Sequence, residues 1–406
     1  MLRNRTLLAI SLSVCAAYTG IGMVGPVRVL FAQSHGASLA IIGAMASAYL
    51  ISNFVFQYPS GWLADRWGRK QVMVLGLAIQ AVLSLLYLLI TDPILFVALR
   101  FIEGMAAAAI LPSARAMIID VVPAEKQGEA FGIFSAFFNA GFLLGPGLGG
   151  LLAITGYASA FIGAAVFRVV AIVIVITLIP VARKERSDTR KETVTPAIPY
   201  RALFALPLLG AYILAFGDYL YLGFDLTLMP LWMHDHLGAS VTVIGIAYMA
   251  WAVPNIIFSP VGGRMADRFR RSLIIAIFGL AQVPLYFLYG AATMASFVVV
   301  LFAIHGLFYA FIQPAVDAHL AASSRSTMRA RVQGMYSTVG LMGAFFGANV
   351  FSPLYAVNYR LPLFTMGTLF GLCVIVGSVM VRISESRREV VVEDVGEVGV
   401  VEAMRD

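Results

Sequence analysis

The sequence predicts an all-α integral membrane protein in which twelve transmembrane helices form two pseudosymmetric six-helix bundles. Composition is the first observation: 60% of the residues are hydrophobic and 12% are charged, whereas a soluble domain carries about 25% charged residues. The second is a series of apolar runs of about 20 residues, which is the length that crosses a hydrocarbon core of ~30 Å. The third is an internal repeat, because the second half of the chain restates motifs of the first.

The twelve apolar runs are the predicted helices. Each must be helical in lipid, because an open strand or a loop would leave backbone groups unpaired. The first run follows basic residues as a signal peptide does, but Pro26 and Arg28 stand where a cleavage site would lie, so we expect it to be retained. In chain order the runs lie near 6–30, 41–62, 71–91, 94–118, 130–154, 158–180, 204–230, 241–262, 272–291, 295–320, 332–355 and 361–381.

The repeat has a constant offset of 202 residues. The segment Gly61-Trp-Leu-Ala-Asp-Arg-Trp-Gly-Arg-Lys70 returns as Gly263-Arg-Met-Ala-Asp-Arg-Phe-Arg-Arg271, and the same offset maps Gly36-Ala-Ser38 onto Gly238-Ala-Ser240. A constant offset over about a hundred residues indicates a duplication. Two similar halves with a site between them are typical of secondary transporters.

The repeat and the apolar runs divide the chain into four parts. Residues 1–180 form a first six-helix bundle and residues 204–381 a second. The segment 181–203 is polar and dense in charge, so we expect a cytoplasmic linker. The segment 382–406 is polar and mixed in charge, so we expect a disordered cytoplasmic tail.

Basic residues predict the orientation in the membrane. Lys and Arg collect in alternate loops, including 66–70 and 264–271, whereas the other loops contain one basic residue, Arg360. The positive-inside rule therefore places both termini in the cytoplasm. The short loops favour a plasma membrane, and a bacterial inner membrane in particular. The net charge of +7 is spread over short loops, which argues against a nucleic-acid partner.

Enzymes are the class that the sequence argues against most strongly. The two polar segments are too short for a catalytic domain, and no metal-ligand, nucleophile or phosphate-loop pattern appears in them. We therefore expect no catalytic residues, no metal and no cofactor. Cys15 and Cys373 both lie in predicted membrane helices, where they are expected to be apolar fillers rather than a disulfide framework.

Three motifs resemble those of the major facilitator superfamily. The segment Gly61-x-Leu-Ala-Asp-Arg-x-Gly-Arg-Lys70 is similar to that family's signature between its second and third helices, and 263–271 is a degraded copy with Arg270 in place of a glycine. Arg100 and Gly104 resemble the fourth-helix motif, in which Glu103 stands where the family usually has Gln. The segment 141–150 resembles the fifth-helix motif of twelve-helix drug:proton antiporters. The resemblance spans roughly 6–381 and implies the major facilitator fold.

The resemblance implies a cytoplasmic gate at the two signature loops. Asp65 is expected near the end of the second helix, with Gly61 and Gly68 permitting a tight turn. Asp120 is the implied partner of Arg69, and the equivalent position in the other half is Ala322, so we expect the stronger latch in the first half. The alternative is that these loops merely anchor helix ends at the membrane surface. The gating residues are Gly61, Asp65, Arg66, Gly68, Arg69, Asp120, Asp267, Arg268 and Arg271.

The fifth-helix motif is expected to act through close packing. Glycines let neighbouring helices approach closely, and a proline removes one backbone hydrogen bond and bends the helix. Packing at the interface of the halves is at least as well supported as a direct role in coupling. The residues are Gly141, Gly145, Pro146, Gly149 and Gly150.

Charges inside the predicted helices are the sharpest functional signals, because each costs about 2.5–3.5 kcal/mol on insertion scales. Arg100 and Glu103 are three residues apart and share a helix face, so they can pair. Asp218 and Asp225 lie seven apart on one stripe of the seventh helix. We expect at least one of these carboxylates to exchange a proton. The alternative is that hydrogen bonds hold them and they only shape a cavity.

Two further arginines in the predicted helices are harder to interpret. Arg28 is expected to snorkel from the outer end of the first helix, and the alternative is contact with an anionic substrate. Arg168 lies in the middle of the sixth helix, and the sequence indicates no role for it. No dense basic cluster in the sequence indicates a site for phosphate or an organic anion.

The resemblance implies proton-coupled efflux of lipophilic or cationic small molecules by alternating access. The expected partners are the lipid bilayer, a small-molecule substrate and protons, and the chain is expected to be a monomer. One alternative is a dedicated exporter or importer of one metabolite, such as a sugar or an amino-acid derivative, and another is a membrane sensor without flux. The predicted cavity residues are Tyr18, Met23, Met105, Tyr219, Tyr309 and Gln313.

Overall fold

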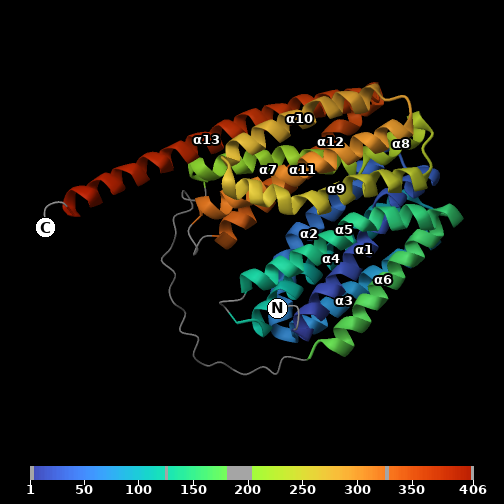
Figure 1. Cartoon of the computed structure of the whole chain (residues 1–406). Coiled ribbons are helices and arrows are strands. Elements are labelled where there is room, and N and C mark those ends of the chain that lie inside the picture. The colour runs from blue at the N-terminus through green and yellow to red at the C-terminus, as the bar shows by residue number, and fades with distance from the viewer. Residues whose placement is uncertain (1–3, 124–126, 181–203, 325–328, 404–406) are drawn as a thin grey trace.

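The computed structural model describes residues 4–123, 127–180, 204–324 and 329–403, and the regular structure in these ranges is helical. Twelve of the helices are long and apolar enough to cross a membrane, which confirms the predicted number of spans. Figure 1 shows the helices of the first half, in blue to green, beside those of the second half, in yellow to red. The predicted linker, residues 181–203, lies outside the described residues.

The first half contains six long helices and two short 3₁₀ turns. They are α1 (Arg5–Ser34), α2 (Leu39–Trp67), α3 (Arg69–Leu86), η1 (Tyr87–Leu89), α4 (Pro93–Val121), α5 (Gln127–Leu152), η3 (Ala153–Thr155) and α6 (Tyr157–Leu178). The second half contains α7 (Leu206–Asp225), α8 (Leu228–Leu237), α9 (Val241–Arg268), α10 (Arg271–Ala291), α11 (Ala295–Ser323), α12 (Arg329–Val357) and α13 (Leu361–Ala403).

Part of the sequence repeat is helix-capping chemistry. Gly36 and Gly238 occupy equivalent positions and both have positive φ, 84° and 61°, a conformation that glycine adopts without steric cost. Two residues later, the hydroxyls of Ser38 and Ser240 accept hydrogen bonds from the first turns of α2 and α9, each at 3.3 Å. The repeated Gly-Ala-Ser segment therefore ends one helix and begins the next in both halves.

The predicted helix at 204–230 is divided in the structure. It ends as α7 at Asp225 and resumes as α8 at Leu228. Pro230 accounts for the break, because its ring clashes with the carbonyl of the residue four positions earlier, Leu226. The hydroxyl of Thr227 also donates back to the carbonyl of Gly223 at 2.8 Å.

The tail prediction differs from the structure. We expected the chain from residue 382 onward to be disordered, but α13 continues as one helix to Ala403, and Figure 1 shows it extending beyond the other helices. The segment 382–403 contains no proline. Extension of an existing helix costs far less free energy than nucleation of a new one. The polar segment therefore continues the membrane helix.

The two halves meet through pairs of helices that the repeat makes equivalent. α5 packs on α9, and α2 packs on α12. A Cβ at Gly43 would lie 3.3 Å from the carbonyl oxygen of Ala348, and a Cβ at the equivalent Gly245 would lie 2.7 Å from that of Pro146. Positions 348 and 146 are themselves related by the 202-residue offset, so the interface is pseudosymmetric.

The contacts between the halves lie toward one side of the membrane. We call the side that carries 65–70 and 267–271 the basic side, and the other the opposite side. In the described ranges, hydrogen bonds join three residue pairs across the halves: Gln33 to Asp235 at 2.8 Å, Ser47 with Asn349 at 2.7 and 3.0 Å, and Thr242 to Gly150 O at 3.0 Å. All three lie in the part of the bundle nearer the opposite side.

Candidate functional site

The signature segment 61–70 forms the end of one helix and the start of the next. α2 continues through Asp65 and Arg66 to Trp67, and Gly68, with φ of 105°, makes the turn into α3. Gly61 lies inside α2 rather than in a turn, which corrects its predicted role; open space surrounds it, since a Cβ there would meet nothing within 4 Å. Asp65 is exposed, and no hydrogen bond or ion pair joins it to another described residue.

Arg69 ties the start of α3 to the end of α4. Its guanidinium forms an ion pair with Asp120 and donates a hydrogen bond to the carbonyl of Ala116 at 2.7 Å. This is the pairing that the family resemblance implied. Lys70 reaches α6 instead, where it donates to the carbonyl of Ile179 at 2.6 Å. A cation at a helix C-terminus is favourable, so these two side chains hold three helix ends together.

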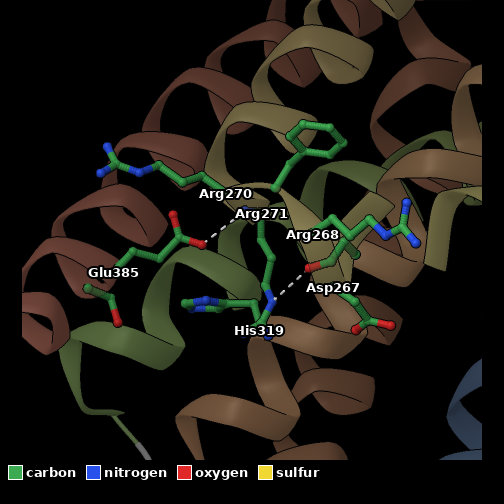
Figure 2. Close-up of a pocket in the computed structure, with 9 residues that line it drawn as sticks. Asp267, Arg268, Arg270, Arg271, His319 and Glu385 are labelled. Atoms are coloured by element: carbon green, nitrogen blue, oxygen red, sulfur yellow. Dashed lines mark hydrogen bonds between the residues drawn. The ribbon is translucent and has the colours of Figure 1, made fainter. Parts of the chain in front are cut away.

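The degraded copy in the second half is held by a different residue. Glu385 of α13 accepts a hydrogen bond from the backbone N–H of Arg271 at 3.0 Å and from the hydroxyl of Ser272 at 2.5 Å, as Figure 2 shows for Arg271. Its carboxylate therefore caps the N-terminus of α10. Asp267 and Arg268 are exposed. The sequence reasoning missed Glu385; the signal was a single acid just after the last apolar run.

The fifth-helix glycines contact two different partners. A Cβ at Gly145 would lie 2.7 Å from Thr19 O, and those at Gly141 and Gly149 would overlap backbone atoms of Cys15 and Met23. These three glycines recur every four residues and let α5 lie directly on α1. Gly150 faces the other half instead, where its Cβ would lie 2.9 Å from Val241 O, and Pro146 O contacts Gly245 there as well. The motif thus packs α5 both within its half and across the interface.

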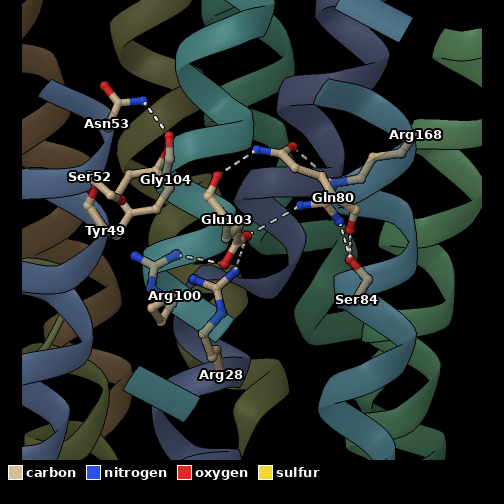
Figure 3. Close-up of polar contacts among 10 residues, drawn as sticks. All are labelled: Arg28, Tyr49, Ser52, Asn53, Gln80, Ser84, Arg100, Glu103, Gly104 and Arg168. Atoms are coloured by element: carbon tan, nitrogen blue, oxygen red, sulfur yellow. Dashed lines mark hydrogen bonds and ion pairs between the residues drawn. The ribbon is translucent and has the colours of Figure 1, made fainter. Parts of the chain in front are cut away.

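A buried ionic cluster occupies the first half. Glu103 of α4 lies 3.0 Å from Arg28 of α1, 2.9 Å from Arg100 of its own helix and 3.6 Å from Arg168 of α6, as Figure 3 shows. The Glu103 side chain is 4% exposed. The predicted Arg100–Glu103 pair is therefore present, but it is part of a larger set. Arg28 does not snorkel, because its side chain is buried and paired.

Polar side chains of α3 complete this cluster. Arg168 donates to Gln80 Oε1 at 3.3 Å and to the hydroxyl of Ser84 at 2.5 Å, and the Gln80 amide donates to the backbone carbonyl of Glu103 at 3.4 Å. The role of Arg168, which the sequence left open, is therefore to bind Glu103 and α3. Gln80 and Ser84 are spaced four apart on a helix of otherwise apolar character, and that spacing was the available signal.

A hydrogen-bonded chain occupies the second half. The hydroxyl of Tyr309 on α11 lies 3.1 Å from Asp218 Oδ2 on α7 and 3.0 Å from Gln313 Oε1, and the Gln313 amide lies 3.2 Å from Asp317 Oδ1. Residues 309, 313 and 317 recur every four positions and so form one stripe along α11. Asp218 is half-buried and Asp317 is exposed. This series of hydrogen bonds therefore connects an intramembrane carboxylate with the basic side.

Asp225 is separate from this chain. It lies at the end of α7 with a relative exposure of 8%, and the hydroxyl of Tyr248 donates to its backbone carbonyl at 2.9 Å. Among the described residues, its Oδ1 has no hydrogen-bond partner. The two acids that the sequence placed on one stripe therefore have different surroundings.

The predicted cavity residues also divide. Tyr309 and Gln313 belong to the hydrogen-bonded chain, and Tyr18, Met105 and Tyr219 are half-buried. Met23 is 0% exposed, and its backbone lies against Gly149 of α5. Met23 therefore packs between helices and does not line an open space, because the small residues of α5 let α1 and α5 pack closely at this position.

Comparisons with known proteins agree with this architecture. Residues 10–228 and 220–399 match the family model of the Major Facilitator Superfamily. The chain is 26% identical over 376 residues to "Multidrug resistance protein 2" of Bacillus subtilis (strain 168), covering 90% of this chain and 92% of that protein. It is 24% identical over 374 residues to "Quinolone resistance protein NorA" of Staphylococcus aureus, covering 89% and 92%.

Solved structures show the same fold at lower identity. A D-xylose-proton symporter matches with a TM-score of 0.72 and 15% identity, over 92% of this chain and 96% of the other. A bacterial homologue of the human lysosomal transporter Spinster, in an inward-facing and unoccupied conformation, matches with a TM-score of 0.70 and 16% identity, over 93% and 96%. The chain therefore belongs to the Major Facilitator Superfamily and is a multi-pass membrane transporter rather than an enzyme.

Proposed function

We propose that this protein is a proton-coupled exporter of lipophilic small molecules, cations among them, in a bacterial cell membrane. The observation that carries the proposal is the Asp218–Tyr309–Gln313–Asp317 chain. An acid inside the membrane is costly, so its presence there indicates a functional site, and Asp218 has a hydrogen-bonded connection toward the basic side. The bacterial multidrug and quinolone resistance proteins that the chain resembles support the substrate class.

The hydrogen bonds that Tyr309 makes depend on whether Asp218 is protonated. A phenol has a single hydrogen to donate, yet the Tyr309 oxygen is within hydrogen-bond distance of two acceptors. When Asp218 is ionised, Tyr309 donates to it. When Asp218 is protonated, Asp218 donates to Tyr309, and the phenol hydrogen turns to Gln313. Uptake or loss of one proton thus reorders the hydrogen bonds between α7 and α11.

The ionic cluster argues against Glu103 as the exchanging acid. Three guanidinium groups surround its carboxylate. Protonation of Glu103 would leave three buried positive charges without a counterion, and an uncompensated buried charge costs several kcal/mol. Among the described residues, Asp218 is paired with Tyr309 and with no arginine or lysine, so its charge can change without that penalty.

The arrangement of the halves supports alternating access. Their hydrogen bonds to each other lie toward the opposite side, which corresponds to an inward-facing state if the basic side is cytoplasmic. Asp65, which pairs with no described residue, and the ion pair of Arg69 with Asp120 would then be the gate elements on the cytoplasmic side. In the outward-facing state, such groups can exchange partners across the halves.

Inside-out membrane vesicles provide the test. With an imposed proton gradient, tetraphenylphosphonium and a panel of neutral lipophiles and sugars are added, and proton efflux is recorded against vesicles without the protein. We expect several unrelated lipophiles to release protons, and Asp218→Asn and Asp65→Asn to reduce that release while the proteins stay folded. Release by a single sugar or amino-acid derivative would favour a dedicated carrier instead. Ligand binding without flux would favour a sensor.

A further inference from the structure

Three arginines that are far apart in the sequence converge on one carboxylate. Arg28, Arg100 and Arg168 come from α1, α4 and α6, and all three lie within 3.6 Å of Glu103. Three positive charges against one negative leave an excess of two. The sequence indicated no basic cluster, because its members are spread over three helices. In a low-dielectric setting such an excess favours the binding of a further anion.

The cluster also has hydrogen-bond donors that it does not use. Nε of Arg28 is buried and has no hydrogen-bond partner among the described residues, and Nη2 of Arg168 makes only the 3.6 Å ion-pair contact with Glu103 and no hydrogen bond. Buried polar groups in proteins are nearly always paired. An excess of positive charge together with unused donors is the arrangement expected of an anion site that a ligand completes.

The cluster is accessible from one end. The side-chain exposure falls from 13% at Arg100 to 8% at Arg28 and 0% at Arg168. The guanidinium of Arg100 also lies over the ring of Tyr49 on α2, 4.1 Å from its centroid. Figure 3 shows Arg100 and Tyr49 on one side of Glu103 and Arg168 on the other. A ligand therefore reaches Arg100 first, beside an aromatic surface.

These features define the chemistry of the ligand. Guanidinium groups can bind a planar carboxylate through two parallel hydrogen bonds, because their fork of donors matches its two oxygens. The ring of Tyr49 beside Arg100 suits an apolar body attached to that carboxylate. In the second half, the stretch 202–263 is acidic, because it contains Asp218, Asp225 and Asp235 but no lysine or arginine.

We propose that Arg100 and Arg28 bind the anionic group of the transported molecule, so that the substrates include lipophiles that carry a carboxylate. The inference rests on the proposed function and names a substrate class for the same central site. A molecule with a carboxylate at one end and an ammonium group at the other fits both halves, with its anion at Arg100 and its cation at Asp218.

Equilibrium binding to the purified protein in detergent tests the inference without any proton gradient. The probes are 1-pyrenebutyrate and its methyl ester, which differ in the charge of one group, and binding is read from energy transfer from the tryptophans. We expect the wild-type protein to bind the carboxylate at least about tenfold more tightly than Arg100→Gln does, with little change for the ester. Arg360→Gln is the matched control, because this arginine is exposed and also lies over a tyrosine, Tyr359.

The outcomes separate the two proposals. Equal affinity of the wild-type protein for the acid and the ester, or the same loss of acid binding in Arg360→Gln, would overturn the inference. If Arg100→Gln does not fold, Arg100→Lys replaces it, because lysine keeps the charge but lacks the guanidinium's paired donors. A weaker preference for the acid over the ester in that variant supports the inference, and an unchanged preference contradicts it. Proton release by cations in vesicles, together with no preference for the acid, would leave the proposed function intact and remove only this site.

Discussion

The hydroxyl of Tyr309 lies 3.1 Å from Oδ2 of Asp218, and the same oxygen lies 3.0 Å from Gln313. This places one phenol between an intramembrane acid and a chain of polar groups that ends at an exposed carboxylate. A single hydrogen shared between two acceptors is a two-state element, and its state follows the proton on Asp218. Proton coupling in this account therefore depends on the second half, while the first half holds the buried arginines.

Removal of the Tyr309 hydroxyl should uncouple the two ends of this chain. Tyr309→Phe keeps the ring and removes the hydroxyl that joins Asp218 to Gln313. We expect proton-coupled flux to fall by about tenfold or more, within the range that a positioned proton-transfer group contributes, with the protein still folded. Tyr212→Phe is the matched control, because the buried Tyr212 hydroxyl has no hydrogen-bond partner among the described residues. Equal flux in the two variants would contradict the role of Tyr309.

Neutralisation of Glu103 should strongly destabilise the first half. Glu103→Gln removes the carboxylate that, among the described residues, compensates Arg28, Arg100 and Arg168. Loss of one partner from a buried ionic set costs about 3–5 kcal/mol, so we expect a clear drop in the thermal unfolding temperature in detergent. Asp267→Asn, at an exposed acid, should leave that temperature unchanged. A Glu103→Gln protein as stable as the wild type would mean that the cluster holds another anion in solution.

A methyl group at the interface of the halves should disfavour the conformation described here. In Gly245→Ala the new Cβ would lie 2.7 Å from Pro146 O and 2.9 Å from Gly150 Cα. Overpacking of this kind costs about 1–3 kcal/mol, and here the cost applies only while the halves touch on the opposite side. We expect lower thermal stability and slower transport. Gly263→Ala on the same helix meets nothing within 4 Å and should behave like the wild type; matching losses in both variants would count against the interface.

Glu385 should hold the start of α10 in place. In Glu385→Gln the carboxylate that accepts from Arg271 N–H and from Ser272 becomes a neutral amide. Loss of a capping interaction costs about 0.5–2 kcal/mol. We expect faster amide hydrogen exchange in the first turn of α10 and unchanged exchange in the other helices. Ser386→Ala, at the exposed neighbour, is the control, and equal exchange rates in both variants would show that Glu385 does not cap the helix.

The sequence predicted the fold well because its signals are local or repeated. Run length and composition indicate spans without any knowledge of packing, and the 202-residue offset identifies equivalent residues such as Ser38 and Ser240, which cap equivalent helices. The break between α7 and α8 could also have been predicted from the sequence. In a continuous helix the ring of Pro230 would clash with the backbone carbonyl of Leu226. That signal was present but was not used.

The site was less predictable because it depends on how the helices rotate against one another. The Arg100–Glu103 pair is three residues apart and could be read directly, whereas Arg28 and Arg168 reach Glu103 only when α1 and α6 turn particular faces toward α4. The same holds for Tyr309, which could be listed as a cavity residue but not assigned to Asp218. The prediction that Met23 lines the cavity differs from the structure for a related reason, because the contact of α1 with the glycines of α5 buries this side chain.

The most direct measurement is proton release by the purified protein on substrate binding. Tetraphenylphosphonium is added to wild-type protein, Asp218→Asn and Asp225→Asn in weakly buffered detergent solution, and the pH change is recorded alongside binding. We expect the wild type and Asp225→Asn to release protons as the cation binds, and Asp218→Asn to bind the cation without release. Undiminished release from Asp218→Asn would contradict the central claim, because the exchanging proton would then belong to another group.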